Sequence, residues 1–474
     1  MAPLFFVSFG LGIVLGFYFS NFWLFVGVAV ICMFFVGAKN LSPLRSDIFI
    51  LLLFICLGAV WAIPVIKQSR VIDDLVGTRF IASSNICPIA IKIITIPQQK
   101  STRNTCYAII RAIHELPLQK KVKVFDYTRQ LEYLRTYRVG VDGVGPKYKI
   151  SCRNYQGRPF YTLWIKKDAA IKSLPSSFWN KCAIAATNYT MSVFKNNLSD
   201  QAYRFMSSVF LGRRELLGND KEVFINAGVA HLLAISGLHM GITTLAVFFI
   251  LGVLGIKFRS KLLISLVFLC SYTIITGASA SSVRAVAMYA VFVFGFFLQR
   301  KVSSFNSLSL AGLISLVINP MVLFEVGFQL SFLAVFSLII GYEIFHPKTI
   351  KPVVANYIRQ IIFSSTCVAL FTAPLIAYYF GRVYLMSILY NVALIPYFAM
   401  ILTINFVMIV LSPITFFAQS LGVVLSWLVS GFIMLTGFLG GGKFSFFHFR
   451  ATVAQLIAFY FLLILLIFKK TRTV

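Results

Sequence analysis

The chain has 474 residues and a formal net charge of +29, with 59% hydrophobic and only 12% charged residues. With a mean hydropathy of +0.87, this composition excludes an ordinary soluble globular protein, and repeated apolar runs of about 20 residues predict a polytopic α-helical membrane protein. The eight cysteines form no CxxC pair and no zinc-finger spacing, so the sequence predicts no structural metal site and no cofactor.

The first 66 residues are predicted to form three transmembrane spans, at 4–20, 22–38 and 48–66. The first apolar run, LFFVSFGLGIVLGFYFS, has the length of a signal-peptide core. It lacks a basic n-region and a small-x-small cleavage site, and a second apolar run follows almost at once. We therefore expect it to be a retained span.

The composition changes between residues 67 and 178, which are mixed in polarity and strongly basic. Five stretches have the β-branched and aromatic content of short strands: residues 79–96, 105–113, 121–125, 147–152 and 160–167. They predict a small β-barrel or sandwich domain. This domain has 20 Lys and Arg against 7 Asp and Glu, a charge of about +13. The positive-inside rule does not explain that excess, because the rule weakens for long domains.

Basic and aromatic residues alternate within the stretch KVKVFDYTRQLEYLRTYR, residues 121–138. This pattern is typical of a groove that follows a phosphate backbone and stacks bases. Contact with anionic lipid headgroups and a merely solvated surface remain alternatives. The candidate DNA-binding residues are Lys121, Lys123, Arg129, Arg135 and Arg138.

Residues 179–229 have the pattern of amphipathic helices that lie at a membrane interface. From residue 230 to the end, nine further spans are predicted, at 231–256, 262–278, 284–299, 305–319, 321–341, 361–380, 385–411, 416–439 and 451–468. The total is 10–12 spans, several of them interrupted by Gly or Pro and therefore broken or re-entrant.

Basic clusters fall on alternate connections between the predicted spans: Lys39 with Arg45, Lys257–Arg259–Lys261, Arg300–Lys301, Lys348–Lys351 and Lys469–Lys470–Arg472. The positive-inside rule then predicts that both termini are cytoplasmic and that residues 67–178 are extracytoplasmic.

The segment AHLLAISGLHMGITT, residues 230–244, contains two of the five histidines. A continuous helix would separate His231 from His239 by about 12 Å, too far for one metal ion. A hydrolase based on Ser236 is disfavoured, since AISGL is not the GxSxG turn. Two interpretations remain open: Ser236 and Gly237 break a helix that lines an aqueous cavity, or small residues allow close helix packing.

Three further polar residues lie within predicted spans, namely Arg284, Glu325 and Gln329. Ionisable groups inside a bilayer are costly and usually face a bundle interior or an aqueous path. Arg284 and Glu325 either form a structural ion pair or line such a path. Arg382, in YYFGRVY, is expected near the outer interface.

Residues 205–411 carry four motifs in order: LGRRELLGNDKEVFINAGVAHLLAISGLHMGI, YTIITGASASSVRAVAMYAVFVFGFFLQRK, SLAGLISLVINPMVLFEVGFQLSFLAVFSL and FTAPLIAYYFGRVYLMSILYNVALIPYFAMIL. They resemble the ComEC family, the inner-membrane channel of bacterial natural transformation. The resemblance implies that single-stranded DNA, delivered outside by a receptor protein, passes through the membrane to the cytoplasm.

The same resemblance implies an OB-like fold for the outer domain and assigns the central channel residues. By motif, these are His231, Ser236, Gly237 and His239, with Arg284, Glu325 and Gln329 in neighbouring spans. The implied partners are single-stranded DNA, membrane lipids, a DNA receptor, a separate nuclease, and a cytoplasmic motor or single-strand-binding protein.

The C-terminal end of the sequence differs from the family pattern. Many members carry a C-terminal metallo-β-lactamase-like domain, whereas this sequence ends in KKTRTV about six residues after the last predicted span. No nuclease, ATPase or hydrolase motif is present, so we expect a non-enzymatic protein.

Some members of the family have a disulfide in the outer domain, and Cys106–Cys152 is the preferred pairing here. A small-solute or lipid transporter on the same scaffold is the alternative function, and a scaffold that recruits a nuclease is a weaker one.

Overall fold

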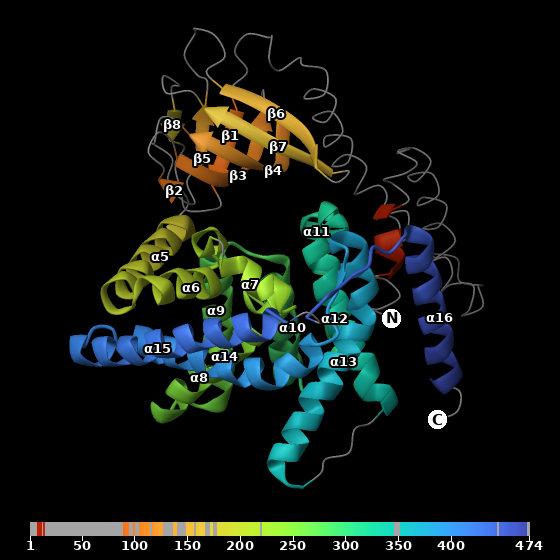
Figure 1. Cartoon of the computed structure of the whole chain (residues 1–474). Coiled ribbons are helices and arrows are strands. Elements are labelled where there is room, and N and C mark those ends of the chain that lie inside the picture. Colours follow the sequence, from red (N-terminus) through yellow and green to blue (C-terminus); the bar gives the residue numbers. More distant parts are fainter. Residues whose placement is uncertain are drawn as a thin grey trace. The chain divides into compact units, whose positions relative to one another are not determined.

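The structure is a computed structural model, and its elements are shown in Figure 1. It describes residues 7–11, 13–14, 89–93, 98–99, 104–113, 116–126, 136–139, 148–155, 158–165, 171–173, 178–218, 220–345, 351–442 and 445–471. The described residues fall into two compact units, divided within a helix between residues 188 and 189. The three predicted N-terminal spans lie outside the described residues, apart from a helical stretch within residues 7–14.

The first unit contains an eight-stranded sheet. Its strands are β1 (Ile89–Ile93), β2 (Gln98–Gln99), β3 (Asn104–Ile113), β4 (Leu116–Asp126), β5 (Thr136–Val139), β6 (Tyr148–Tyr155), β7 (Arg158–Ile165) and β8 (Ile171–Ser173). The five strands expected from the sequence are therefore confirmed, as β1, β3, β4, β6 and β7. Three short strands, β2, β5 and β8, were not expected, since two to four residues give no clear alternation.

The order across the sheet is β6-β7-β4-β3-β1-β5-β8, with β2 paired to β3. All neighbouring strands are antiparallel except β4 and β7, which run parallel with Lys123 opposite Thr162. Val124 in β4 and Tyr137 in β5 are buried. One parallel pair in an antiparallel sheet means that the chain crosses over between β4 and β7.

Helices follow the sheet: α5 (Phe178–Asn197), α6 (Asp200–Leu211), the 3₁₀ turn η1 (Arg214–Leu217) and α7 (Asp220–Asn226). Ser199 caps α6, because its side chain accepts a hydrogen bond from the Ala202 N–H. Gly212 ends the helix in the left-handed conformation, with φ of 75°. The apolar residues of α6 pack against protein, whereas Phe178 and Trp179 of α5 are exposed. The expected interfacial position remains a prediction for both helices.

Nine longer helices correspond one to one with the nine spans predicted after residue 230. They are α8 (Gly237–Val253), α9 (Phe258–Ile275), α10 (Ala280–Phe297), α11 (Ser304–Ile318), α12 (Val326–Phe345), α13 (Val353–Phe380), α14 (Ser387–Val410), α15 (Thr415–Gly440) and α16 (Val453–Thr471). Within the described residues, six of them are long and apolar enough to cross a membrane: α9, α10, α12, α13, α14 and α15. Shorter apolar stretches lie in α8, α11 and α16.

The span predicted from residue 361 starts eight residues inside α13, whereas two predicted spans start five or six residues before their helices. The span predicted from residue 231 begins six residues later, because residues 230–232 form the 3₁₀ turn η2 and Ser236 caps α8. The span predicted from residue 321 begins at Val326, after the 3₁₀ turn η3 (Pro320–Phe324). In each case apolar residues belong to a separate turn, which hydropathy alone does not distinguish from a helix.

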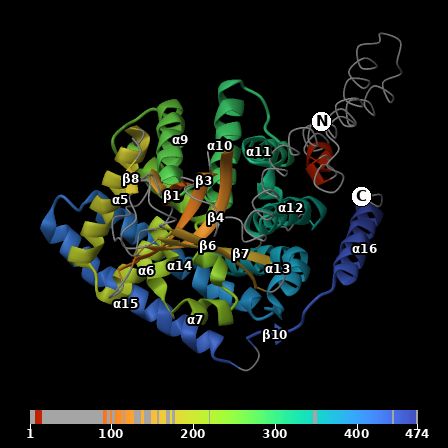
Figure 2. The same ribbon diagram turned by 90° about the horizontal axis from the view of Figure 1, so that it is seen from above.

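Helix α10 occupies a central position within the second unit. It contacts α8, α9, α11 and α12, and Figures 1 and 2 both show it between α9 and α11. On one side α14 packs against α8 and α15, and on the other α12 packs against α13. A residue on α10 can therefore touch both groups of helices.

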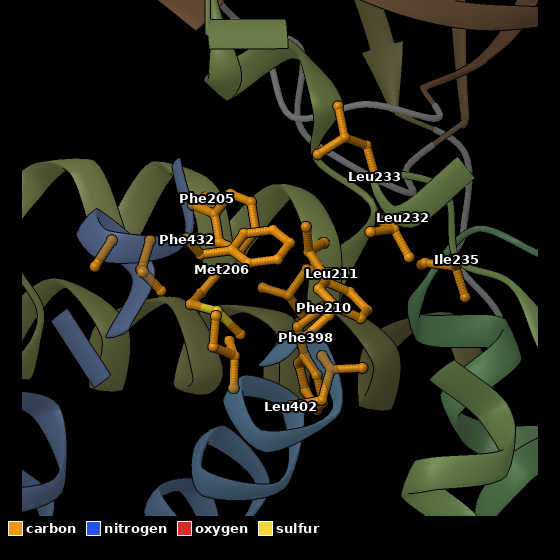
Figure 3. Close-up of a cluster of buried hydrophobic side chains, with 14 of the residues drawn as sticks. Phe205, Met206, Phe210, Leu211, Leu232, Leu233, Ile235, Phe398, Leu402 and Phe432 are labelled. Atoms are coloured by element: carbon orange, nitrogen blue, oxygen red, sulfur yellow. The ribbon is translucent and has the colours of Figure 1, made fainter. Parts of the chain in front are cut away.

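The core of this unit is a cluster of buried apolar side chains in which distant segments meet (Figure 3). Phe205 of α6 stacks near Phe224 of α7, with ring centroids 5.7 Å apart, and Phe432 of α15 lies 5.8 Å from Phe205. Leu232, Leu233 and Ile235 join the same cluster, each no more than 3% exposed. The segment before α8 is thus held by the core.

The outward faces of several helices are apolar. Leu245, Phe249 and Val253 of α8 are 70–74% exposed and lie four residues apart, on one face. On α15, Met434 and Phe438 are 80% and 82% exposed. Continuous exposed apolar stripes are typical of a surface that contacts lipid.

Candidate functional site

The segment between α7 and α8 is anchored at its start by contacts with the connection after α13. Arg382, in the short strand β9 (Arg382–Val383), donates a hydrogen bond from Nη1 to Asn226 Oδ1 at 3.1 Å. Gly228 has a φ of +72°, and a Cβ at this position would lie 2.7 Å from the Cβ of Tyr384. Only glycine fits both the backbone conformation and the space.

Ser236 and His239 form a capping box at the start of α8. The Ser236 hydroxyl accepts the backbone N–H of His239, and the Ser236 backbone N–H donates to His239 Nδ1 at 3.2 Å. Histidine thus occupies the position that Glu or Gln takes in the usual motif. Because Nδ1 accepts, the network assigns the ring proton to Nε2.

The His239 ring is 1% exposed and lies edge-on to Phe398, with centroids 5.0 Å apart. Its Nε2 atom has no hydrogen-bond partner among the described residues. Ser236 Oγ also lies 3.0 Å from His239 Nδ1, the spacing of a nucleophile and its base. A triad needs a third group that orients the imidazole, and no such group binds Nε2 in the described part of the chain.

The chain does not run as one helix from His231 to His239, since it is extended at Ser236 with ψ of 174°. His231 lies on η2 with an exposed side chain, whereas His239 is buried. No group of three or more His, Cys, Asp or Glu residues suited to a metal ion occurs among the described residues.

Arg284 lies near the start of α10 and is only 5% exposed. Its Nη1 donates to the backbone oxygen of Ser331 in α12. The guanidinium lies 5.7 Å from the ring centroid of Phe332. Its Nη2 lies 3.7 Å from the position that a Cβ on Gly237 would take. Arg284 therefore joins α8, α10 and α12.

Gln329 and Glu325 lie at the start of α12. Gln329 Nε2 donates to the Leu323 oxygen at 2.9 Å, and its Oε1 accepts from Tyr379 at 2.9 Å. This amide therefore links η3, α12 and α13. Glu325 is exposed, immediately before the first residue of α12, where a carboxylate is favoured by the helix dipole. Glu325 therefore lies just before α12 and not inside the helix of the predicted span, and its pairing with Arg284 or its place along a path stays a prediction.

Comparison with known proteins identifies the family. The family described as "Competence protein" matches residues 209–473, which is more than half of the chain. The chain belongs to the ComEC family of competence proteins.

Two relatives share parts of this chain. "ComE operon protein 3" of Bacillus subtilis (strain 168) is 37% identical over 171 residues, which are 36% of this chain and 21% of that protein. An "Uncharacterized protein" of Aquifex aeolicus (strain VF5) is 27% identical over 164 residues, 32% of this chain and 37% of the relative. The matched region thus spans about a fifth and about two fifths of these relatives. No solved structure matches.

The ComEC family match includes every channel residue named from the sequence. The structure brings Ser236, Gly237, His239 and Arg284 together, whereas Gln329 and Glu325 lie at the opening turn of α12. Sequence reasoning missed three contacting residues. Asn226 accepts a hydrogen bond from Arg382, Tyr379 donates one to Gln329, and the Phe398 ring lies against His239. Their partners are 50 to 159 residues away in the sequence, and no local pattern links them.

Only some of the residues predicted to bind DNA in the outer domain of this ComEC-family chain lie among the described residues. Lys121 and Lys123 lie in β4 and Arg138 in β5, while Arg129 and Arg135 lie outside the described residues. Cys106 lies in β3 and Cys152 in β6. Two strands, β4 and β7, lie between β3 and β6, so the pairing, which stays a prediction, requires a strongly curved sheet.

Proposed function

We propose that this chain is an inner-membrane channel that moves single-stranded DNA into the cytoplasm during natural transformation. The observation that carries the proposal is the match to the competence protein family over residues 209–473. The match contains all nine apolar helices and the capped start of α8. Competence is the ability to take up DNA, and a multi-pass helical protein is the component suited to the bilayer step.

The helix order supports an orientation for this channel. Basic clusters lie at the start of α9, after α10, between α12 and α13, and at the end of α16. With alternating spans, these four positions share one side of the membrane, which the positive-inside rule makes the cytoplasm. The start of α8 and residues 67–178 then face the outside, and both termini are cytoplasmic.

The outer domain would bind the incoming strand. Its charge of about +13 attracts polyanions. Five long strands with one parallel pair, β4 with β7, agree with an OB-like arrangement. OB-like domains bind single strands in a basic groove with aromatic stacking. Lys121, Lys123 and Arg138 are the described candidates for contacts with phosphates.

Other proteins would supply the remaining steps. We assign the channel no enzymatic role, so a DNA receptor, a separate nuclease and a cytoplasmic motor or single-strand-binding protein would be its partners. Membrane lipids would cover the apolar stripes of α8 and α15.

The test is a deletion of the gene in its own cell, followed by exposure to fluorescent DNA that carries a selectable marker. We expect DNA to accumulate outside the inner membrane and transformants to disappear. Electroporation of the same marker, which bypasses the channel, should still give transformants. Normal transformation in the deletion strain would refute the proposal.

A further inference from the structure

Two positive groups converge at the start of α8. The first is the helix N-terminus, since 17 aligned residues place about half a positive charge on the opening turn. The second is the guanidinium of Arg284, whose Nη2 lies 3.7 Å from the Cβ position of Gly237, the first residue of the helix. Such a pair repels unless an anion lies between or beside its members.

Several hydrogen-bond donors at this point lack a partner in the described part of the chain. Arg284 is 95% buried, yet its one hydrogen bond uses Nη1, and Nε has no partner. The capping box satisfies the backbone N–H groups of Ser236 and His239. The backbone N–H groups of Gly237 and Leu238 have no preceding helical carbonyl to bind. A buried, unpaired donor on a cation is costly without a ligand.

The immediate surroundings supply no counter-charge. Among the described residues, no carboxylate contacts Arg284, whose neighbours are the Ser331 carbonyl and the Phe332 ring. The start of α8 is also accessible to a ligand, since Ser236, Gly237 and Leu238 are each only half-buried. A Cβ at Gly241, one turn further along α8, would meet no atom within 4 Å, so space is open beside the helix.

We propose that the α8 N-terminus and Arg284 together bind one phosphodiester group of the single strand at the outer end of the channel. A guanidinium fork and backbone N–H groups at a helix N-terminus both suit phosphate oxygens. Gly237, with no side chain, lets the phosphate reach the backbone. This inference rests on the proposed function, because it assumes that a DNA strand passes α8.

The test uses the full chain in nanodiscs, with the substitution Gly241→p-benzoylphenylalanine as a local photo-cross-linker. The probe is radiolabelled (dT)20, added at increasing concentration and at several salt concentrations. The half-saturating concentration of the cross-link is compared for the parent and for Arg284→Gln. The matched control is Arg300→Gln, which removes the same charge from an exposed position beyond the other end of α10, about 24 Å away at 1.5 Å per residue.

We expect Arg284→Gln to raise the half-saturating concentration about tenfold or more, as for the loss of a charge-assisted hydrogen bond. The slope of log affinity against log salt should fall by about 0.7, the value for one phosphate on a single strand. Arg300→Gln should leave both unchanged. On the parent protein, (dT)20 with neutral methylphosphonate linkages should lose the cross-link, a test that does not depend on how Arg284→Gln folds.

The possible outcomes distinguish a failure of the proposed phosphate site from a failure of the proposed channel function. If the parent cross-links (dT)20 but Arg284→Gln and the neutral backbone leave the yield unchanged, the phosphate site is refuted and the channel proposal stands. If the parent gives no DNA cross-link while the deletion strain still loses transformation, the strand does not pass α8 and the site is again refuted. A parallel sample contains radiolabelled phosphatidylglycerol. An Arg284-dependent cross-link to that lipid, with none to DNA, would assign the site to a lipid headgroup and overturn the proposal.

Discussion

Replacing Gly237 by leucine is expected to block DNA transport while the protein remains inserted and folded. A Cβ at this position would lie 3.7 Å from Arg284 Nη2, an ordinary contact distance, so alanine fits. Leucine adds three further carbon atoms in the space beside the guanidinium. Overpacking of this kind costs about 1–3 kcal/mol. Displacing Arg284 from the Ser331 carbonyl costs about 1.5–3 kcal/mol more, as a hydrogen bond to a charged group.

The helix itself gains about 0.5–1 kcal/mol when glycine is replaced, so the net local cost is about 2–5 kcal/mol. This cost falls on the contact between α8 and α10, not on the aromatic core around Phe205 and Phe432. We therefore expect normal membrane insertion and a single monodisperse peak in detergent. Transformation should fall to the level of the deletion strain.

The assay counts transformants in the deletion strain complemented with each variant. Gly437→Leu is the matched control, because a Cβ there would also lie 3.7 Å from one neighbouring side chain, Val223, but on α15 and not beside Arg284. Gly237→Ala should retain most activity. Wild-type transformation by Gly237→Leu would refute the assigned role of the α8 start.

Three further predictions concern stability and DNA binding. Ser236→Ala removes the hydroxyl of the capping box and should cost about 1 kcal/mol, and an unchanged melting temperature would argue against the cap. Gly228→Ala should lower the melting temperature more than Ser236→Ala does, because a left-handed alanine costs about 1–2 kcal/mol and its Cβ would lie 2.7 Å from the Cβ of Tyr384. A melting temperature equal to or above that of Ser236→Ala would contradict the close contact with Tyr384. The double variant Lys121→Ala with Lys123→Ala should reduce the salt slope of (dT)20 binding by about 1.4, two phosphates at about 0.7 each. A slope that stays at the parent value would remove these lysines from the DNA interface.

Much of the fold follows from local patterns in the sequence. Each of the nine spans predicted after residue 230 has its helix, because a long apolar run has few other stable forms in a membrane. The five long strands were predictable from β-branched and aromatic alternation. The basic clusters that alternate between spans also needed only the sequence.

The geometry of the site was not predictable in the same way. The sequence left two interpretations of Ser236 and Gly237 open, a helix break that lines a cavity and close helix packing. The structure places both residues at the start of α8, after the 3₁₀ turn η2, and the cavity stays a prediction. The sequence pattern does not reveal the capping box, because His239 replaces the usual Glu or Gln. The approach of Arg284 to Gly237 joins residues 47 positions apart. Only the packing of α10 against α8 determines such a contact.

The most direct test of the channel is electrophysiology with the purified full chain in a planar bilayer. An applied potential supplies the driving force, so no motor protein is needed. We expect single-stranded DNA to block the ionic current transiently and to appear in the opposite chamber, where amplification detects it. Double-stranded DNA of the same length should not cross, and Gly237→Leu should pass neither. If the inserted protein carries no current that single-stranded DNA changes, and no strand crosses, the proposal that this chain is the DNA channel is contradicted.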